Sequence, residues 1–204
     1  MIPLLRAPLI YNKPVVPGSA SYTTPGTYSL IVPNHNSITI DSRGAGGGGG
    51  GPGGAVGTTS YYGGTGVTGG YSQAYYSPNS SLLNAIGYGG AGGTGQGAGT
   101  PGSNGSNGTA SGGDSNLTGG GDAGGSAGYV YIPSSGNTIY AGTGGTGGRS
   151  VRTVSRGILV PGQTLTIIVG TRGSPGANAS NTNSNIQQHG AGYGNNGAVY
   201  ISWA

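Results

Sequence analysis

The chain has 204 residues, of which 51 are glycine, with a formal net charge of +4 and only 5% charged residues. With 32% hydrophobic residues, one Met, one Trp and no Phe, it cannot build a large core of bulky side chains. The absence of Cys excludes a disulfide framework and a thiolate metal site, and no apolar stretch reaches the roughly 20 residues needed to span a bilayer.

Such a glycine content is typical of disordered chains, because ordering glycine costs more backbone entropy than ordering any other residue. The low charge, the 14 tyrosines and four alternating apolar segments are not typical of a solvated tail. We therefore expect one ordered domain. Its seven basic residues are too scattered for the dense basic stripe of a nucleic-acid-binding module, so no nucleic-acid partner is expected.

The N-terminal residues 1–20 contain prolines at positions 3, 8, 14 and 17, which disfavour a helix. These prolines also interrupt the apolar run that an export signal would need. We predict an extended arm for attachment or oligomerisation. Its candidate contact residues are Leu4, Leu5, Arg6, Leu9, Ile10 and Tyr11.

Strand patterns flank the glycine-rich middle. Residues 29–32 and 37–41 follow a Pro-Gly turn signal, and residues 163–169 and 198–203 are again β-branched and alternating. Pairing between the two ends of the chain predicts an all-β fold with a small β-sandwich-like frame, formed by residues 21–45 and 158–204. Residues 46–157 are then a glycine-rich insert with loops.

Glycine recurs every third residue in the middle, most strictly from Gly99 to Gly108. A three-residue period is typical of polyglycine II-type helices, which have no internal hydrogen bonds and must bond to their neighbours. Residues 44–54 and 89–95 have glycine on two or three faces and are expected inside a bundle, whereas residues 99–108 suit an edge. The triplet runs are too short, and the prolines too few, for collagen.

Residues for catalysis are scarce. The chain has no Glu, three aspartates that suit turns (Asp41, Asp114 and Asp122) and two histidines, His35 and His189, expected on solvated loops. No nucleophile elbow, phosphate-binding loop or metal-ligand spacing is present. We therefore expect no enzyme activity, catalytic residue, metal or cofactor.

The tyrosines are the informative group. Those expected on loops between glycine runs are the receptor-binding candidates Tyr61, Tyr62, Tyr71, Tyr75, Tyr76, Tyr129, Tyr131 and Tyr140. Tyrosine brings a large, stiff contact area to binding loops at low entropic cost. The alternative is that the rings cover a glycine bundle that has few side chains of its own to exclude water.

The motifs YTTPGTYSLIVP (residues 22–33) and ITIDSRGAGGG (38–48), followed by PGQTLTIIVG (161–170) and GAVYISW (197–203), form an ordered set. In this order they resemble the glycine-rich domain of tail fibres and related adhesins of tailed bacteriophages, over about residues 21–204. The resemblance implies a bundle of polyglycine II helices whose distal loops contact a host receptor.

The expected function is a non-enzymatic virion protein, a tail-fibre or tail-tip receptor-binding protein exposed outside the host cell. Expected partners are other virion proteins, a protein or glycan receptor on the bacterial surface, and further copies of the chain, by analogy with fibres as a trimer. Membrane insertion is not expected. The alternatives are a capsid or tail decoration protein that holds subunits together, and an ice-binding bundle, which needs a flat Thr-rich face that the scattered threonines do not suggest.

Overall fold

The computed structural model describes residues 14–56, 59–79, 84–96 and 99–204. These residues form antiparallel β-sheets with one 3-10 turn, η1 (Ser77–Asn79), which confirms the predicted all-β class. The candidate contact residues of the N-terminal arm lie outside the described part. In the described ranges, no helix is both long and apolar enough to cross a membrane.

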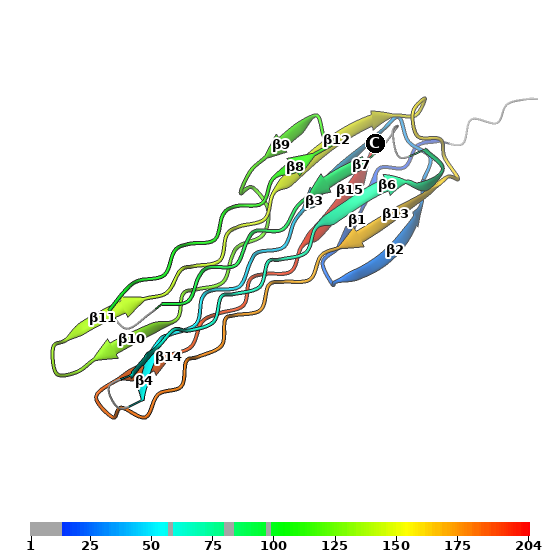
Figure 1. The fold of residues 1–204 in the computed structure, drawn as a ribbon. Helices are drawn as coiled ribbons and strands as arrows, with labels where there is room; N and C mark the ends of the chain where they lie inside the picture. The colour runs from blue at the N-terminus through cyan, green and yellow to red at the C-terminus, as the bar shows by residue number, and fades with distance from the viewer. Residues whose placement is uncertain (1–13, 57–58, 80–83, 97–98) are drawn as a thin grey trace, which may run out of the picture.

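Two five-stranded sheets occupy one end of the elongated molecule and are called the frame (Figure 1). The first sheet contains, in spatial order, β1 (Gly18–Tyr22), β15 (Ala198–Trp203), β3 (Ser37–Arg43), β12 (Arg149–Ser155) and β9 (Ser115–Leu117). The second contains β2 (Gly26–Ile31), β13 (Thr164–Val169), β6 (Ser72–Tyr76), β7 (Asn84–Gly87) and β8 (Ala110–Ser111).

One buried cluster joins the inner faces of the two frame sheets. Ile38 and Ile40 of β3 alternate with more exposed residues, as a strand with one covered face requires. Leu165 and Ile167 of β13 alternate in the same way and belong to the same cluster. The core is therefore made of aliphatic side chains of moderate size, in keeping with the absence of phenylalanine.

The four strands predicted from the sequence are present as β2, β3, β13 and β15, and the two ends of the chain pair as expected. Strand β2 pairs with β13, and β3 pairs with β15, both antiparallel. The predicted division into frame and insert is wrong, because the region 46–157 supplies five frame strands: β6, β7, β8, β9 and β12. The chain repeatedly leaves the frame and returns, and the late strands β12, β13 and β15 each lie between two earlier strands of their sheet.

Eight glycine-rich segments, counted within the described residues, connect the frame to the opposite end of the molecule, called the distal end (Figure 1). They alternate in direction and run side by side. Their ranges are 44–53, 62–71, 88–96, 99–109, 118–128, 141–148, 170–186 and 190–197.

The segment 44–53, called the central segment, is bonded on all sides. Every N–H from Gly44 to Gly51 donates to a carbonyl of another segment, and every C=O from Gly44 to Pro52 accepts such a bond. The partners repeat every three residues: Gly44, Gly47 and Gly50 all donate to segment 141–148. An extended chain cannot form hydrogen bonds between its own N–H and C=O groups, and here the neighbouring segments supply those bonds instead.

Six segments surround the central segment and form the ring. Three of them accept its N–H groups (62–71, 141–148 and 190–197), and three donate to its carbonyls (88–96, 118–128 and 170–186). Segment 99–109 lies outside the ring, and its backbone bonds to the neighbouring segments 88–96, 141–148 and 118–128 and to Tyr140 of β11. The prediction that residues 44–54 are interior and residues 99–108 an edge agrees with these bonds, whereas residues 89–95, also predicted to be interior, lie in the ring, where Thr94 is exposed.

Candidate binding surface at the distal end

Short strands close the distal end. A three-stranded antiparallel sheet has the order β11 (Asn137–Tyr140), β10 (Tyr129–Ile132) and β14 (Gln187–His189), and a hairpin joins β4 (Gly54–Val56) to β5 (Thr59–Tyr61). None of these strands contains Asp, Glu, Lys or Arg. The distal end is thus a surface with little charge, carried on the tips of the glycine segments (Figure 1).

One face of the three-stranded sheet, called the aromatic face, gathers four rings from three strands: Tyr129, Tyr131, Tyr140 and His189. Tyr129 is opposite both Tyr140 and His189 in the strand register. The rings of Tyr129 and His189 stack with centroids 4.3 Å apart and planes at 12°, and those of Tyr129 and Tyr140 lie 5.5 Å apart. Tyr140 is 56% exposed. Rings held in this way offer apolar area for stacking, with hydroxyl and imidazole groups for hydrogen bonds.

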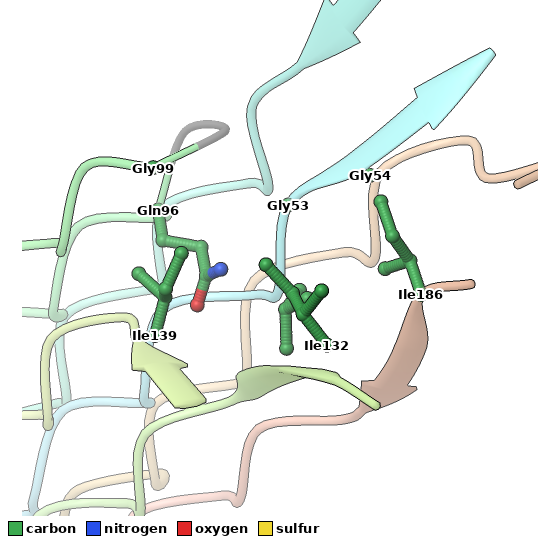
Figure 2. Close-up of a pocket in the computed structure, with 8 residues that line it drawn as sticks. Gly53, Gly54, Gln96, Gly99, Ile132, Ile139 and Ile186 are labelled. Atoms are coloured by element: carbon green, nitrogen blue, oxygen red, sulfur yellow. The ribbon is translucent and has the colours of Figure 1, made fainter. Parts of the chain in front are cut away.

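The other face of the same sheet is aliphatic, because successive side chains of a strand point to opposite sides. Val130 and Ile139 are cross-strand partners there and line a pocket against the end of the glycine bundle (Figure 2). The sheet therefore has one apolar face toward the bundle and one aromatic face away from it.

Side-chain amides fix the third strand and its approach to the bundle. The Nε2 of Gln188 donates to the carbonyls of Gly53 at 2.6 Å and Ala179 at 2.9 Å. The side chain of Asn181 accepts from the N–H of Asn183 and donates to the carbonyl of Ile186. These bonds hold β14 in place, so the position of His189 relative to Tyr129 is set by the scaffold.

The tyrosines predicted to bind a receptor lie in different parts of the molecule. Tyr129, Tyr131 and Tyr140 form the aromatic face, and Tyr61 and Tyr62 lie at the end of the distal hairpin, 42% and 72% exposed. Tyr71 is exposed at the frame end of segment 62–71.

The expectation that the tyrosines lie on loops is wrong for Tyr61, Tyr129, Tyr131 and Tyr140, which lie in short distal strands. It is also wrong for Tyr75 and Tyr76. Both belong to β6 of the frame, opposite Thr166 and Leu165 of β13. The Tyr76 hydroxyl accepts a hydrogen bond from Gln163 Nε2 at 2.8 Å. In the run SQAYY, buried residues alternate with partly buried ones, as in a strand of a sheet. The glycine-rich segments on either side made a loop the simpler prediction.

The expectation of solvated loop histidines is correct only in part, because His189 is exposed but lies in β14, and His35 lies on a loop but is not solvated. His35 is fully buried in the frame, where its Nδ1 lies 2.9 Å from the carbonyl oxygen of Pro33. His189 is the residue of the aromatic face that sequence reasoning missed. The only local signal for it is the short run QQH before a glycine, which is too weak to predict a strand by itself.

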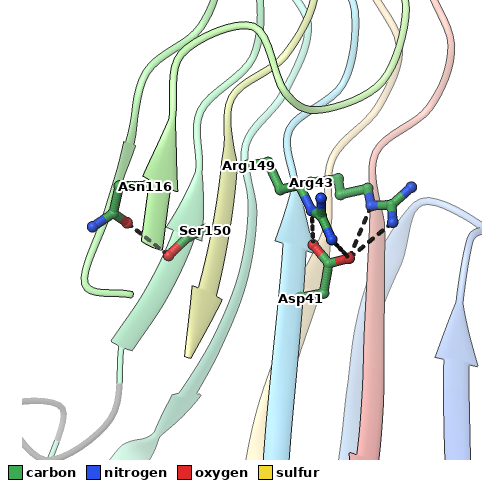
Figure 3. A network of polar contacts seen from close by, with 5 residues as sticks. All are labelled: Asp41, Arg43, Asn116, Arg149 and Ser150. Carbon is green, nitrogen blue, oxygen red and sulfur yellow. Dashed lines mark hydrogen bonds and ion pairs between the residues drawn. The ribbon is translucent and has the colours of Figure 1, made fainter. Parts of the chain in front are cut away.

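Three charged residues, Asp41, Arg43 and Arg149, meet in the frame, near the start of the glycine bundle (Figure 3). Asp41, in the middle of the β3 ladder rather than in a turn, accepts bonds from Arg43 at 2.8 Å and Arg149 at 2.8 and 2.9 Å. Burial raises the pKa of Asp41, but the hydrogen bonds and charges of Arg149 and Arg43 outweigh it and hold the pKa below its usual value. Burial raises the pKa of the nearby Asp122. This cluster ties three strands together, because Arg43 also lies over the Tyr200 ring of β15.

Replacement of Asp41 by asparagine should destabilise the protein by about 1–2 kcal/mol at pH 7, since the two partly exposed arginines lose charge-assisted hydrogen bonds. Because the folded pKa of Asp41 is depressed, its contribution is present above the unfolded pKa and is lost as the pH falls through the folded pKa. Urea unfolding at pH 7 and at strongly acidic pH should therefore give a difference between wild type and Asp41→Asn only at pH 7. An equal difference at both pH values would contradict this assignment.

In the residues that the structure describes, no group of three or more His, Cys, Asp or Glu side chains could hold a metal ion. No family model matches the chain, and no curated protein matches it either.

Proposed function

We propose that this chain is a non-enzymatic receptor-binding protein of a tailed bacteriophage, carried on a tail fibre or at the tail tip and exposed outside the host cell. The observation that carries the proposal is the aromatic face: Tyr129, Tyr140 and His189 meet at the end of the molecule farthest from the frame. Stiff amphipathic rings on a surface of low charge suit recognition of a glycan or a protein.

We further propose that the glycine segments are polyglycine II-type helices and that the frame is a small β-sandwich. The three-residue repeat of hydrogen-bond partners along the central segment supports the first assignment, and the single core shared by the two frame sheets supports the second. A helix of this type rises about 3.1 Å per residue, so a ten-residue segment would hold the distal end about 30 Å from the frame.

In this proposal the bundle is a stiff spacer. Each segment is bonded to its neighbours through the backbone, so the distal strands are displayed without a flexible linker. The frame end is available for other virion proteins, and assembly with further copies, by analogy a trimer, would place several aromatic faces side by side. No enzymatic step or cofactor has a part in this function.

Gold-labelled antibodies against this protein, imaged on intact particles of the phage that encodes it, test the proposal. Label at the tail tip or the fibre ends is the expected result. Label spread over the head would instead identify a capsid decoration protein, and the absence of label from every particle would exclude a virion protein.

A further inference from the structure

The pocket behind the aromatic face has an apolar wall and one unsatisfied polar group. It is a cavity of about 70 Å³, partly open to solvent, between the three-stranded distal sheet and the end of the glycine bundle. Val130, Ile132, Ile139 and Ile186 form its wall, and Gln96 extends into it toward Ile132 and Ile139 (Figure 2). None of the described residues that line the pocket has an ionisable side chain, so it suits a neutral group.

Gln96 occupies a position at which the preceding turns of its segment have glycine. In segment 88–96, Gly90 and Gly93 donate their N–H groups to the central segment, and Gln96 continues this series with a bond to the carbonyl of Gly51. Its own carbonyl accepts from the N–H of Gly63 at 3.0 Å. The backbone of Gln96 thus completes the bundle, while its side chain leaves the bundle and enters the pocket.

The Gln96 amide is buried without a full set of partners. The side chain is 1% exposed, and its Oε1 has no hydrogen-bond partner among the described residues. A buried acceptor without a donor destabilises the folded state, because it has lost its hydrogen bonds to water and gained none in return. A ligand that brings an N–H or O–H group into the pocket would remove this penalty.

We propose that this pocket binds the acetamido group of an N-acetylated amino sugar in a bacterial surface glycan. This inference rests on the proposed receptor-binding function and names the class of receptor. The acetamido group is neutral and carries a methyl group for the isoleucine wall. Its N–H matches the unpaired Oε1 of Gln96.

Saturation-transfer NMR on the full chain with N-acetyl-D-glucosamine and N-acetyl-D-galactosamine tests the pocket directly, with D-glucose as the ligand that lacks the acetamido group. We expect the strongest saturation at the acetyl methyl protons and none on glucose. Gln96→Leu should weaken binding roughly tenfold, since it keeps the side-chain volume but removes the amide. Ile139→Trp should abolish binding by filling the pocket, and Thr138→Ala, the neighbouring position on the opposite face, should leave it unchanged.

Thermal unfolding separates a binding role of Gln96 from a structural one. Without ligand, Gln96→Leu should raise the Tm by roughly 2–4 °C, because an unsatisfied buried amide is replaced by an apolar side chain. A lower Tm would show that the amide has a structural partner and would overturn the proposal. So would equal sugar binding by Gln96→Leu and wild type, or a lack of methyl saturation with either N-acetylated sugar.

Attachment of the purified protein to host bacteria distinguishes failure of this inference from failure of the proposed function. Attachment that N-acetylated sugars do not compete, but that protease treatment of the cells removes, would indicate a protein receptor. It would overturn the glycan inference alone. Sugar binding without any attachment to cells would support the pocket and contradict the receptor-binding function.

Discussion

Replacement of Gly48 by alanine should destabilise the protein by at least about 3 kcal/mol or prevent folding. Gly48 lies in the central segment, where its N–H donates to Val67 at 2.9 Å and its carbonyl accepts from Gly93 at 3.0 Å. A β-carbon at this position would overlap the carbonyl group of Ser174 in another segment. Backbone atoms on both sides cannot move apart without breaking these bonds, so a single methyl group has a large effect.

The matched control is Gly157→Ala, because an added β-carbon there meets no atom within 4 Å and the backbone is not in the left-handed region. This change should be neutral or stabilise the protein by about 0.4–1 kcal/mol, through the unfolded state. Thermal or urea unfolding followed by circular dichroism measures both variants. A Gly48→Ala protein as stable as Gly157→Ala would contradict the close backbone packing of the central segment.

Joint replacement of Tyr129 and Tyr140 by alanine should reduce attachment to host bacteria by roughly 30-fold or more, as loss of a central aromatic contact in an interface does. The two rings pack on each other, and Tyr129 also stacks on His189, so the double change removes most of the aromatic face. Binding of the labelled protein to cells, titrated over concentration, measures the effect.

Tyr71→Ala is the control for this experiment, because Tyr71 is also exposed, at 45%, but lies at the frame end of its segment. Its attachment should equal that of the wild type, and unfolding curves should verify that all variants are folded. If Tyr71→Ala impaired attachment and the distal pair did not, the receptor would contact the protein near the frame. The distal aromatic face would then have no part in recognition.

Several local features were predictable because they depend on neighbouring residues. The alternation in residues 37–41 and 163–169 predicted β3 and β13, and the number of glycine faces separated the central segment from the edge run 99–108. The same reasoning misplaced Tyr75 and Tyr76 as loop residues and overlooked His189. Their surroundings in the sequence resemble those of true loop residues, and their strand partners are distant in the chain.

The sequence by itself determined the two repeats that the molecule uses: alternation by two in the frame strands and glycine by three in the segments between them. Both repeats follow from local backbone geometry. Side chains alternate between the two faces of any strand, and glycine allows two backbones to approach closely wherever it occurs. Only the tertiary structure decided that segment 44–53 is central, that Tyr129 meets His189, and that Gln96 points into an apolar pocket. Glycine segments bond mainly through backbones that are chemically alike, so the choice of neighbour depends on how all the segments pack together.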